Sequence, residues 1–397
     1  MDPVRNPYAP GAGTEPPELA GRASLLEQSR IAVERLRAGR HAKSFIAVGL
    51  RGVGKTVLLN RIARQARESG YRICMIEAQE HKGLPELIVP HLRRTLLELD
   101  RMGALAEQVK RALRVLKSFL PSLKLRYADA ELSLDIDPER GSADSGDLES
   151  DLATLFVAIG EAARARSVAV GILIDEIQYL TESHFGALIL AMHRVSQAGL
   201  PVLLVATGLP QVVGLSGEAK SYAERLFDFP KLDALSEADA ADALQRPAIA
   251  EGAVWDEAAL VLVRKITHGY PYFLQEWGYH AWNQAVGPRI GAQDVRMATD
   301  IAISRLDESF FRVRFDRLTP RERDYLRAMA ETLAGLSRSG DIADRLGMRV
   351  QSVGPLRAGL IKKGMIYSPA HGDTAFTVPL FDEYLRRTIP VWRPRDH

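Results

Sequence analysis

The segment Gly49–Thr56, which reads GLRGVGKT, constrains this chain more than any other feature. A short apolar run, Ser44–Val48, precedes it, and a stretch with helical periodicity, Val57–Glu68, follows it. Glycines let the backbone wrap closely around a ligand, and the N–H groups at the start of a helix attract anions. Strand, glycine-rich turn and helix in this order predict a loop that binds the phosphates of a nucleotide.

Each residue of this loop has an expected role. Lys55 would reach the β- and γ-phosphates, and the Thr56 hydroxyl would bind Mg²⁺. The other residues expected around the phosphates are Gly49, Gly52, Val53, Gly54 and Val57. The alternative is a glycine-rich turn without a ligand, and it explains less, since the flanking strand and helix are the ones that a phosphate-binding loop requires.

A second apolar run, GILIDEIQYL, ends in two carboxylates, Asp175 and Glu176. Ligands of open α/β sheets bind at the carboxyl ends of the strands. Asp175 is therefore expected to hold Mg²⁺ through water, and Glu176 to orient or activate the attacking water. Alone, an Asp-Glu pair would be an ordinary solvated strand end, and the glycine-rich loop is what favours the metal site.

A third apolar strand, Val202–Ala206, ends at Thr207. The Thr207 hydroxyl could contact the γ-phosphate or the water if this strand lies between the other two. Otherwise the threonine simply closes a strand before a Gly-Leu-Pro turn. No asparagine in the chain is followed by lysine, so the Asn-Lys-x-Asp segment that reads guanine is absent and ATP is the expected nucleotide.

Changes of pattern along the 397 residues predict several domains. A proline- and glycine-rich start, residues 1–17, is expected to be a flexible arm. Apolar strands alternating with helices predict an α/β fold, a P-loop ATPase core with a parallel sheet, over residues 18–234, interrupted by an insertion at 84–147. An all-helical lid domain should occupy 235–317, and a C-terminal module with mixed helices and strands 318–397.

The cysteine count and the hydropathy of the chain indicate the cellular compartment in which the protein is expected. The single cysteine, Cys74, excludes an internal disulfide and fits an inert thiol in the core. The longest apolar runs fall far short of the roughly 20 residues that a membrane span needs. The N-terminus has no apolar stretch typical of a signal peptide. We therefore expect a cytoplasmic protein with no membrane partner.

Together, these motifs resemble AAA+ ATPases of the origin-recognition or initiator-like branch and the neighbouring STAND ATPases, over roughly Glu18 to Lys363. The resemblance implies hydrolysis of ATP to ADP and phosphate by a homo-oligomer that shares ATP sites between subunits. It places Thr207 at the sensor-one position. In LAGRASLLEQ it implies that Gly21 and Arg22 flank the adenine.

Two further residues gain implied roles from the same resemblance. In SYAERLFDF, Arg225 falls where the family often carries an arginine finger, and pairing with Asp228 of its own surface is the alternative. In HGYPYFLQ, Gly269 and Pro271 match a Gly-x-Pro motif that contacts nucleotide, although a plain helix start would explain the proline equally well. The chain departs from AAA+ relatives that place a nucleotide-contacting arginine near this point.

The C-terminal module resembles a winged helix-turn-helix. Thr319 and Glu322 are spaced as a capping box at the start of its first helix, and two further helices and a two-stranded hairpin follow. Basic and polar residues gather on the third helix, which in such modules enters the major groove of duplex DNA. The candidate DNA contacts are Arg349, Gln351, Ser352, Arg357, Lys362 and Lys363. A protein partner or a solvated face are the alternatives.

The insertion is a second candidate contact surface. It carries two amphipathic helices, Leu84–Arg101 and Ala104–Leu120, and an alternating stretch typical of a hairpin or edge strand, LKLRYADAELSLDID. Its basic residues are Lys110, Arg111, Arg114, Lys117, Lys124 and Arg126, and a solvated helix face is the simpler explanation. Two functions remain open: an ATPase switch that binds duplex DNA, or a STAND-like, ATP-gated signalling or assembly protein that binds protein.

Overall fold

The protein is described here by a computed structural model, which covers residues 1–11, 13–101, 107–122, 136–332, 336–370 and 372–392. The described residues fall into two compact units. The core unit comprises Arg22–Gly49 and Lys55–Leu232. The C-terminal unit comprises Met1–Gly21, the loop residues Leu50–Gly54 and Asp233 onward. The first twenty-one residues therefore group with the C-terminal half of the chain.

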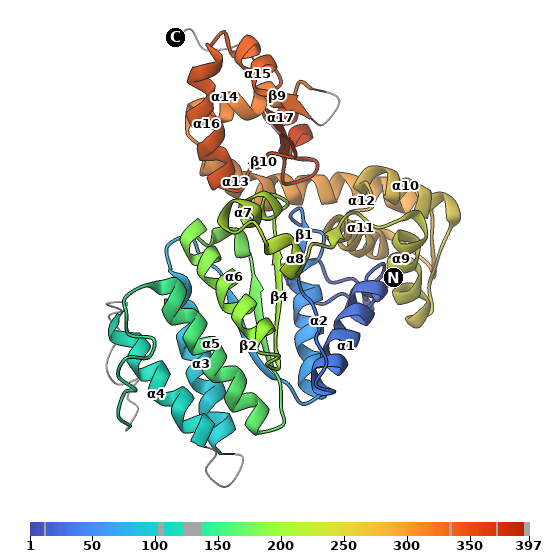
Figure 1. Cartoon of the computed structure of the whole chain (residues 1–397). Coiled ribbons are helices and arrows are strands. Elements are labelled where there is room, and N and C mark those ends of the chain that lie inside the picture. The colour runs from blue at the N-terminus through green and yellow to red at the C-terminus, as the bar shows by residue number, and fades with distance from the viewer. Residues whose placement is uncertain (12, 102–106, 123–135, 333–335, 371, 393–397) are drawn as a thin grey trace. The chain divides into compact units, whose positions relative to one another are not determined.

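A parallel sheet forms the centre of the core unit (Figure 1). Its strands are β1 (Ser44–Gly49), β2 (Arg72–Glu77), β3 (Val170–Asp175), β4 (Val202–Gly208), β5 (Phe227–Asp228) and β6 (Lys231–Leu232). The strand order is β2-β3-β4-β1-β5, and β6 pairs with β1. β1, β3 and β4 are buried along their whole length, as parallel strands covered on both faces should be. The predicted parallel α/β fold is confirmed, and the sheet brings the ends of β1, β3 and β4 to one edge.

Helices cover this sheet, including the two from the predicted insertion. They are α1 (Ala23–Arg37), α2 (Lys55–Glu68), α3 (Leu84–Asp100), α4 (Glu107–Ser122), α5 (Leu148–Ala165), α6 (Glu182–Gln197), α7 (Val212–Ala219) and α8 (Ala223–Leu226). Fully buried residues of α3 and α4, such as Leu92 and Leu116, belong to the same hydrophobic cluster as the sheet. These two helices are therefore part of the core. The predicted hairpin lies almost entirely in 123–135, outside the described residues.

The basic face of α4 is matched by carboxylates of the same unit. Arg111 pairs with Glu139 at 3.1 Å and with Glu161 at 3.0 Å, and Arg114 pairs with Glu107 at 2.7 Å. The Lys117 ammonium donates to the Ile136 carbonyl. These contacts favour a structural role for the basic residues of the insertion. Lys124 and Arg126 lie outside the described part of the chain.

The first half of the C-terminal unit contains α9 (Glu237–Ala250), α10 (Glu257–Thr267), α11 (Pro271–Gln284) and α12 (Ala292–Arg305). Ser236 caps α9 by accepting a hydrogen bond from the Asp239 amide. The structure adds a feature that the all-helical prediction lacked: β7 (Val254–Trp255) pairs in parallel with β8 (Arg289–Ile290). Two-residue strands leave no alternating pattern long enough to be recognised in a sequence.

The N-terminal arm packs onto these helices through Tyr8. The Tyr8 ring is buried, its hydroxyl donates to the Leu244 carbonyl at 2.5 Å, and the Trp255 indole donates to the Tyr8 hydroxyl at 2.7 Å. Gly278 allows this approach, since a Cβ there would come within 2.7 Å of the ring. A 3₁₀ turn, η1 (Pro3–Arg5), precedes Tyr8. Tyr8 thus packs within the C-terminal unit, and a flexible arm over residues 1–17 stays a prediction.

The second half of this unit contains helices around a small antiparallel sheet. In order, its elements are a π-helix η3 (Leu306–Phe311), α13 (Arg312–Asp316), α14 (Pro320–Met329), β9 (Ser337–Arg338), α15 (Ser339–Leu346), α16 (Val350–Lys362), β10 (Ile366–Tyr367), β11 (Asp373–Phe376) and α17 (Phe381–Thr388). The sheet order is β10-β11-β9. The predicted capping box of Thr319 and Glu322 is present. β9 and α17 are additions to the predicted three helices and hairpin.

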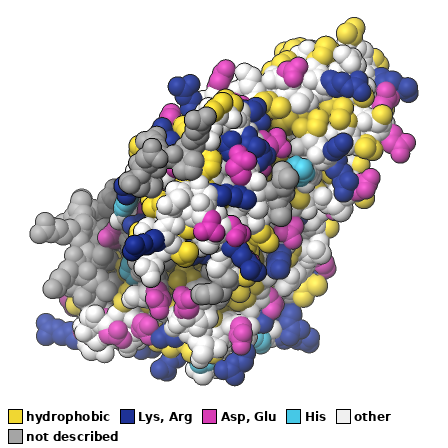
Figure 2. All heavy atoms as spheres, turned by 90° about the horizontal axis from the view of Figure 1, so that it is seen from above, with side chains coloured by type: hydrophobic (Ala, Val, Ile, Leu, Met, Phe, Trp, Pro, Cys, Tyr) yellow, Lys and Arg dark blue, Asp and Glu magenta, His cyan; other side chains and the backbone are white. Residues whose placement is uncertain are grey.

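The described helices, the charged surface and the single thiol can each be compared with an expectation from the sequence. No helix among the described residues has the length and apolar character to cross a membrane. Basic and acidic side chains are interspersed over the face shown in Figure 2. Cys74 is fully buried, and burial raises the pKa of its thiol to about 11, so the reactive thiolate is scarce at neutral pH.

Candidate nucleotide site

The glycine-rich loop connects β1 to α2. Gly52 and Gly54 have φ values of +83° and +87°, a region that residues with a Cβ rarely adopt, so the turn requires glycine at these two positions. α2 begins at Lys55, directly after the loop. The Lys55 side chain is buried, and its ammonium donates to the Gly49 carbonyl at 3.0 Å. The Lys55 ammonium is thus held at the first residue of the loop that is expected to bind the phosphates.

The buried Asp175 carboxylate joins three segments that are distant in sequence. The Thr56 hydroxyl donates to its Oδ2 atom at 2.6 Å, and the Thr207 hydroxyl donates to its Oδ1 atom. The sheet explains this convergence, because β4 lies between β1 and β3 and all three strands end at the same edge. The condition set for Thr207, that its strand lie between the other two, is met.

Glu176 adopts an unusual backbone conformation at the point where β3 ends. Its φ and ψ are 52° and 40°, in the left-handed region. A non-glycine residue there costs of order 1–3 kcal/mol, and such strain is often found at functional sites. The Glu176 backbone amide donates to Asp175 Oδ1 at 2.8 Å, which holds the Asp175 carboxylate against the backbone at the end of β3. The Glu176 side chain is half-buried.

Gln178 is a site residue that the sequence analysis missed. It lies on a 3₁₀ turn, η2 (Ile177–Tyr179), where its amide nitrogen donates to the Glu176 carboxylate and its amide oxygen accepts from the Leu209 N–H at 3.0 Å. Gln178 therefore links Glu176 to the loop that follows β4. An amide two residues beyond a candidate catalytic carboxylate was the only available signal in the sequence.

The oxygens gathered here suit Mg²⁺. This ion prefers oxygen ligands, and in nucleotide sites one or two protein groups and the phosphates hold it. The Thr56 hydroxyl and the Asp175 carboxylate are 2.6 Å apart, so both can face one ion. The residues present therefore fit the metal that the sequence predicts.

Four other residues are expected near the nucleotide, and three of them are buried. Val53 and Val57 are buried beside the loop glycines and on the first turn of α2. Arg22 is buried directly before α1. Gly21 has a φ of +67°, and a Cβ there would come within 3.0 Å of Asp239 Oδ2. Contact of Gly21 and Arg22 with adenine stays a prediction.

The Gly-Tyr-Pro segment serves as a helix start and also touches the loop. Pro271 is the first residue of α11, as proline at a helix N-terminus favours. The next residue, Tyr272, donates its amide hydrogen to the Gly52 carbonyl at 3.1 Å, within the C-terminal unit. A Cβ on Gly52 would approach the Tyr272 Cβ to 3.3 Å. The contact of Pro271 itself with nucleotide stays a prediction.

Arg225 is exposed on the short helix α8. Its expected alternative partner, Asp228, is paired with Lys43 at 2.7 Å. Within the described ranges no ion pair involves Arg225. The alternative hypothesis, that Arg225 pairs with Asp228, is therefore not supported by the structure.

The six candidate DNA contacts separate into two sets. Arg349, Gln351, Ser352 and Lys362 are exposed on and around α16. Arg357 instead donates to the Thr374 hydroxyl, the Ser368 hydroxyl and the Asp373 carbonyl, at 3.2, 2.6 and 3.1 Å. Lys363 pairs with the buried Glu322 at 2.7 Å. Arg357 and Lys363 thus have structural partners, and contact with DNA remains a prediction for the whole set.

The parallel sheet, the glycine-rich loop and the carboxylate at the end of β3 define a P-loop ATPase fold. Residues 18–205 match the family model described as "AAA ATPase domain", so this part of the chain is similar to AAA ATPase domains. Residues 308–385 match a second model, described as "Domain of unknown function (DUF8462)". That match begins within η3, ahead of the boundary expected at 318.

Solved structures agree with the fold. The Walker-type ATPase PABY2304 of Pyrococcus abyssi is 16% identical, with a TM-score of 0.58 over 94% of this chain and 97% of that one. Cdc6p of Pyrobaculum aerophilum is 17% identical with a TM-score of 0.48, covering 98% of each chain. Orc1 of Aeropyrum pernix, solved in complex with DNA, is 16% identical with a TM-score of 0.47, covering 96% of each chain. The first of these similarities supports the fold alone. No curated protein matches the sequence.

Proposed function

We propose that the chain hydrolyses ATP with Mg²⁺ at the carboxyl edge of its sheet and acts as a nucleotide-controlled switch. The observation that supports this most strongly is the Asp175 carboxylate, which accepts hydrogen bonds from the Thr56 and Thr207 hydroxyls. The Thr56 hydroxyl, the Thr207 hydroxyl and the Glu176 backbone amide all donate to the Asp175 carboxylate. The proposed metal ligand and the proposed phosphate-sensing hydroxyl therefore lie next to Glu176.

Each residue of the site has a distinct task in the proposed reaction. Lys55 provides a positive charge for the β- and γ-phosphates, and Mg²⁺, when bound by Thr56 and Asp175, neutralises phosphate charge. Glu176 orients the attacking water by accepting a hydrogen bond from it. Gln178 limits the rotation of the Glu176 carboxylate, since it holds that group and the Leu209 amide at once. Gln178 thus acts on Glu176 as a positioning residue in the proposed reaction.

Substitution of Glu176 by glutamine tests the hydrolysis. Steady-state phosphate release should fall at least about 100-fold, whereas ATP affinity should stay within about twofold, because only the group that handles the water changes. Glu182→Gln is the matched control, since Glu182 is an exposed carboxylate on the first turn of α6. Wild-type turnover in Glu176→Gln would remove Glu176 from the mechanism.

For the C-terminal module we propose contact with duplex DNA. Support comes from the order of α14, α15, α16, β10 and β11, which is the order of three helices and a hairpin expected of a winged helix, and from the exposed polar residues at the start of α16. Arg349, Gln351 and Ser352 can donate to phosphates or to base edges. Exposed Lys362 adds a cation at the other end of the helix.

A double variant, Arg349→Ala with Lys362→Ala, tests this contact. Duplex affinity should fall, and the slope of log affinity against log salt should flatten by about one unit per lost phosphate contact. Arg321→Ala is the control, because Arg321 is an exposed arginine on α14 of the same module. Equal affinity and slope in the double variant and the control would contradict DNA contact.

A protein partner is the second candidate for this module. Val350 is 54% exposed on the first turn of α16, between Arg349 and Gln351. An apolar side chain in that position suits a protein surface as well as it suits DNA. Loss of partner binding in Val350→Asp, with duplex binding absent in the wild type, would favour this function.

We also propose that subunits share ATP sites through Arg225. Its exposure on α8 leaves the guanidinium available to a neighbouring copy. Such a residue can be worth roughly 10³–10⁵ in rate. Specific activity should rise with protein concentration, and Arg225→Ala mixed with Glu176→Gln should regain activity at interfaces that pair both intact residues. Turnover independent of concentration, with no recovery in the mixture, would contradict sharing.

A further inference from the structure

The core unit contains a cavity at the sheet edge opposite the nucleotide site. Its volume is about 350 Å³, and residues at the amino ends of β1 and β4, including Ser44 and Val202, line it. β4 runs from Val202 at the cavity to Gly208 at the nucleotide edge of the sheet, which places the two sites about 20 Å apart along the strand. A ligand in the cavity would therefore not contact the nucleotide site residues.

The inner wall of this cavity is apolar. Met192, Val195, Leu200 and Val202 line it, and each belongs to the buried core of the unit. A volume near 350 Å³ lies at the lower end of the range for small-molecule sites, which are concave and mostly apolar with a few convergent polar groups. The interior therefore suits the apolar body of a small molecule.

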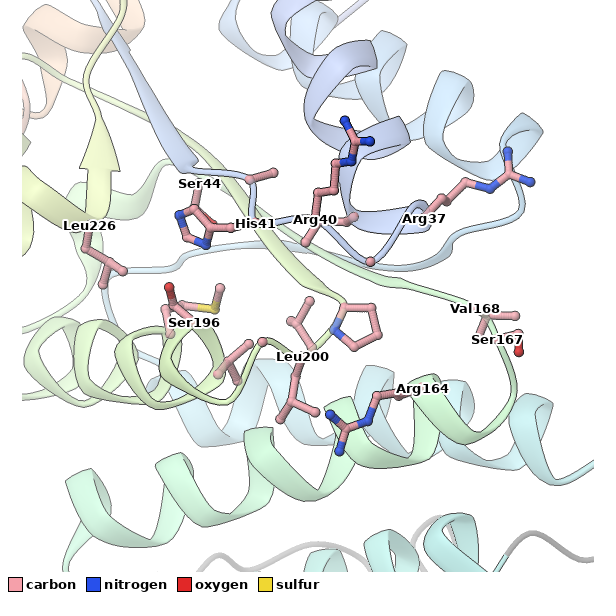
Figure 3. A pocket seen from close by; sticks show the side chains of 18 residues that line it. Arg37, Arg40, His41, Ser44, Arg164, Ser167, Val168, Ser196, Leu200 and Leu226 are labelled. Atoms are coloured by element: carbon pink, nitrogen blue, oxygen red, sulfur yellow. The ribbon is translucent and has the colours of Figure 1, made fainter.

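The charged side chains that line the cavity all carry positive charge. They are Arg37, Arg40 and Arg164, joined by His41, and no aspartate or glutamate is among the lining residues. Figure 3 shows Arg37, Arg40 and His41 on one side and Arg164 on the other, with Leu200 between them. The guanidinium groups of Arg37 and Arg40 point away from Leu200 in this view. Cations therefore flank the opening of an apolar interior.

Contacts within the protein offset the positive charge of only some of these arginines. Arg37 and Arg164 lie in the last turns of α1 and α5, where cations offset the partial negative charge of a helix end. Arg37 also approaches Glu34 at 3.6 Å. Arg40, however, lies in the loop after α1, and across the described ranges no ion pair involves Arg40 or Arg164. Arg40 and Arg164 thus add positive charge to the lining that no ion pair among the described residues offsets.

From these observations we infer that the cavity binds a small amphipathic anion, with its apolar body inside and its carboxylate or phosphate group at the arginine-flanked opening. The site is separate from the nucleotide site. A cationic or neutral molecule of the same shape lacks the partner for Arg40 and Arg164 and should bind more weakly.

Calorimetric titration of the full chain with octanoate and with octyl phosphate tests this inference. Both should bind, with octanol and octyltrimethylammonium at least about tenfold weaker, a difference of about 1.4 kcal/mol. The head group that binds more tightly identifies the preferred anion. Equal binding of octanoate and octanol, or no binding of either anion at millimolar concentration, would overturn the proposal.

Two variants separate binding in the cavity from adsorption to a basic surface. Arg40→Gln with Arg164→Gln should weaken octanoate binding at least about fivefold, whereas the control Arg194→Gln should not, because Arg194 is an exposed arginine on the last turn of α6 outside the lining. Ser196→Phe keeps every cation and fills the space, so it should abolish binding. Unchanged ATP binding and unfolding temperature in Ser196→Phe would show that it folds, and full octanoate affinity in that variant would overturn the proposal.

Discussion

At the carboxyl edge of the core sheet, residues far apart in sequence meet at one carboxylate, whereas on α16 residues close in sequence separate into two sets. Thr56 and Thr207 both donate to Asp175. Arg357 and Lys363, by contrast, are engaged by their own module and Arg349 is exposed. The difference shows that a motif at strand ends predicts positions better than a count of charges on a helix does.

The physical reason lies in the backbone. Hydrogen bonds between parallel strands fix where each strand ends, so a residue at that end has one possible place. On a helix each residue turns the side chain by about 100°. Arg357 follows Val353 by four residues and precedes Leu360 by three, which places it on the helix face that carries these two buried residues. Its inward position could therefore have been deduced from the spacing.

The largest expected effect concerns the sheet edge. Lys55→Ala removes the ammonium that is held at the Gly49 carbonyl, and ATP affinity should fall at least about 100-fold. Titration with a fluorescent ATP analogue measures this loss. Lys82→Ala, at an exposed lysine of the same unit, is the control and should bind as the wild type does. Equal affinities in the two variants would show that the loop does not bind phosphate.

Arg357 gives the next largest effect, and it concerns stability. Arg357→Ala removes hydrogen bonds that connect α16 to β11 and the loop before it, and should lower the free energy of unfolding by about 2–3 kcal/mol. Arg349→Ala should leave stability within about 0.5 kcal/mol, because Arg349 is exposed. Urea denaturation of the full chain compares them. Equal midpoints would mean that Arg357 has no structural role.

Gln178 gives a smaller effect on catalysis. Gln178→Ala frees the Glu176 carboxylate from its amide partner, and turnover should fall about tenfold, equivalent to about 1.4 kcal/mol in the barrier. ATP affinity should not change, since Gln178 is expected to act on Glu176 alone. Phosphate release and ATP binding measured on the same preparation provide the comparison. A loss of affinity with normal turnover would assign Gln178 to binding.

The smallest effect is expected from Lys363. Its ion pair with Glu322 is partly exposed on the lysine side, so Lys363→Ala should cost no more than about 1 kcal/mol of stability. Urea denaturation of Lys363→Ala and Arg357→Ala compares how much each side chain contributes to the free energy of unfolding. A greater loss for Lys363 than for Arg357 would reverse the expected order.

The sequence predicted the elements whose signals are local and missed those that depend on distant contacts. The glycine-rich loop and the Thr319 capping box need only a few neighbouring residues, and both are present. The docking of Tyr8 depends on Trp255 and Leu244, which lie more than 230 residues away. Periodicity carries no information about such a partner. The Gln178 contact is similar, since Leu209 belongs to another strand's end.

The dependence of ATP binding on Mg²⁺ in wild type and Asp175→Asn tests the central claim most directly. If Asp175 joins the metal ligand Thr56 to Thr207, Mg²⁺ should strengthen ATP binding in the wild type, and most of that gain should be lost in Asp175→Asn, because the neutral amide is a poorer ligand for a hard cation. Binding in EDTA should then be similar for the two proteins. An equal gain from Mg²⁺ in both proteins would contradict the account.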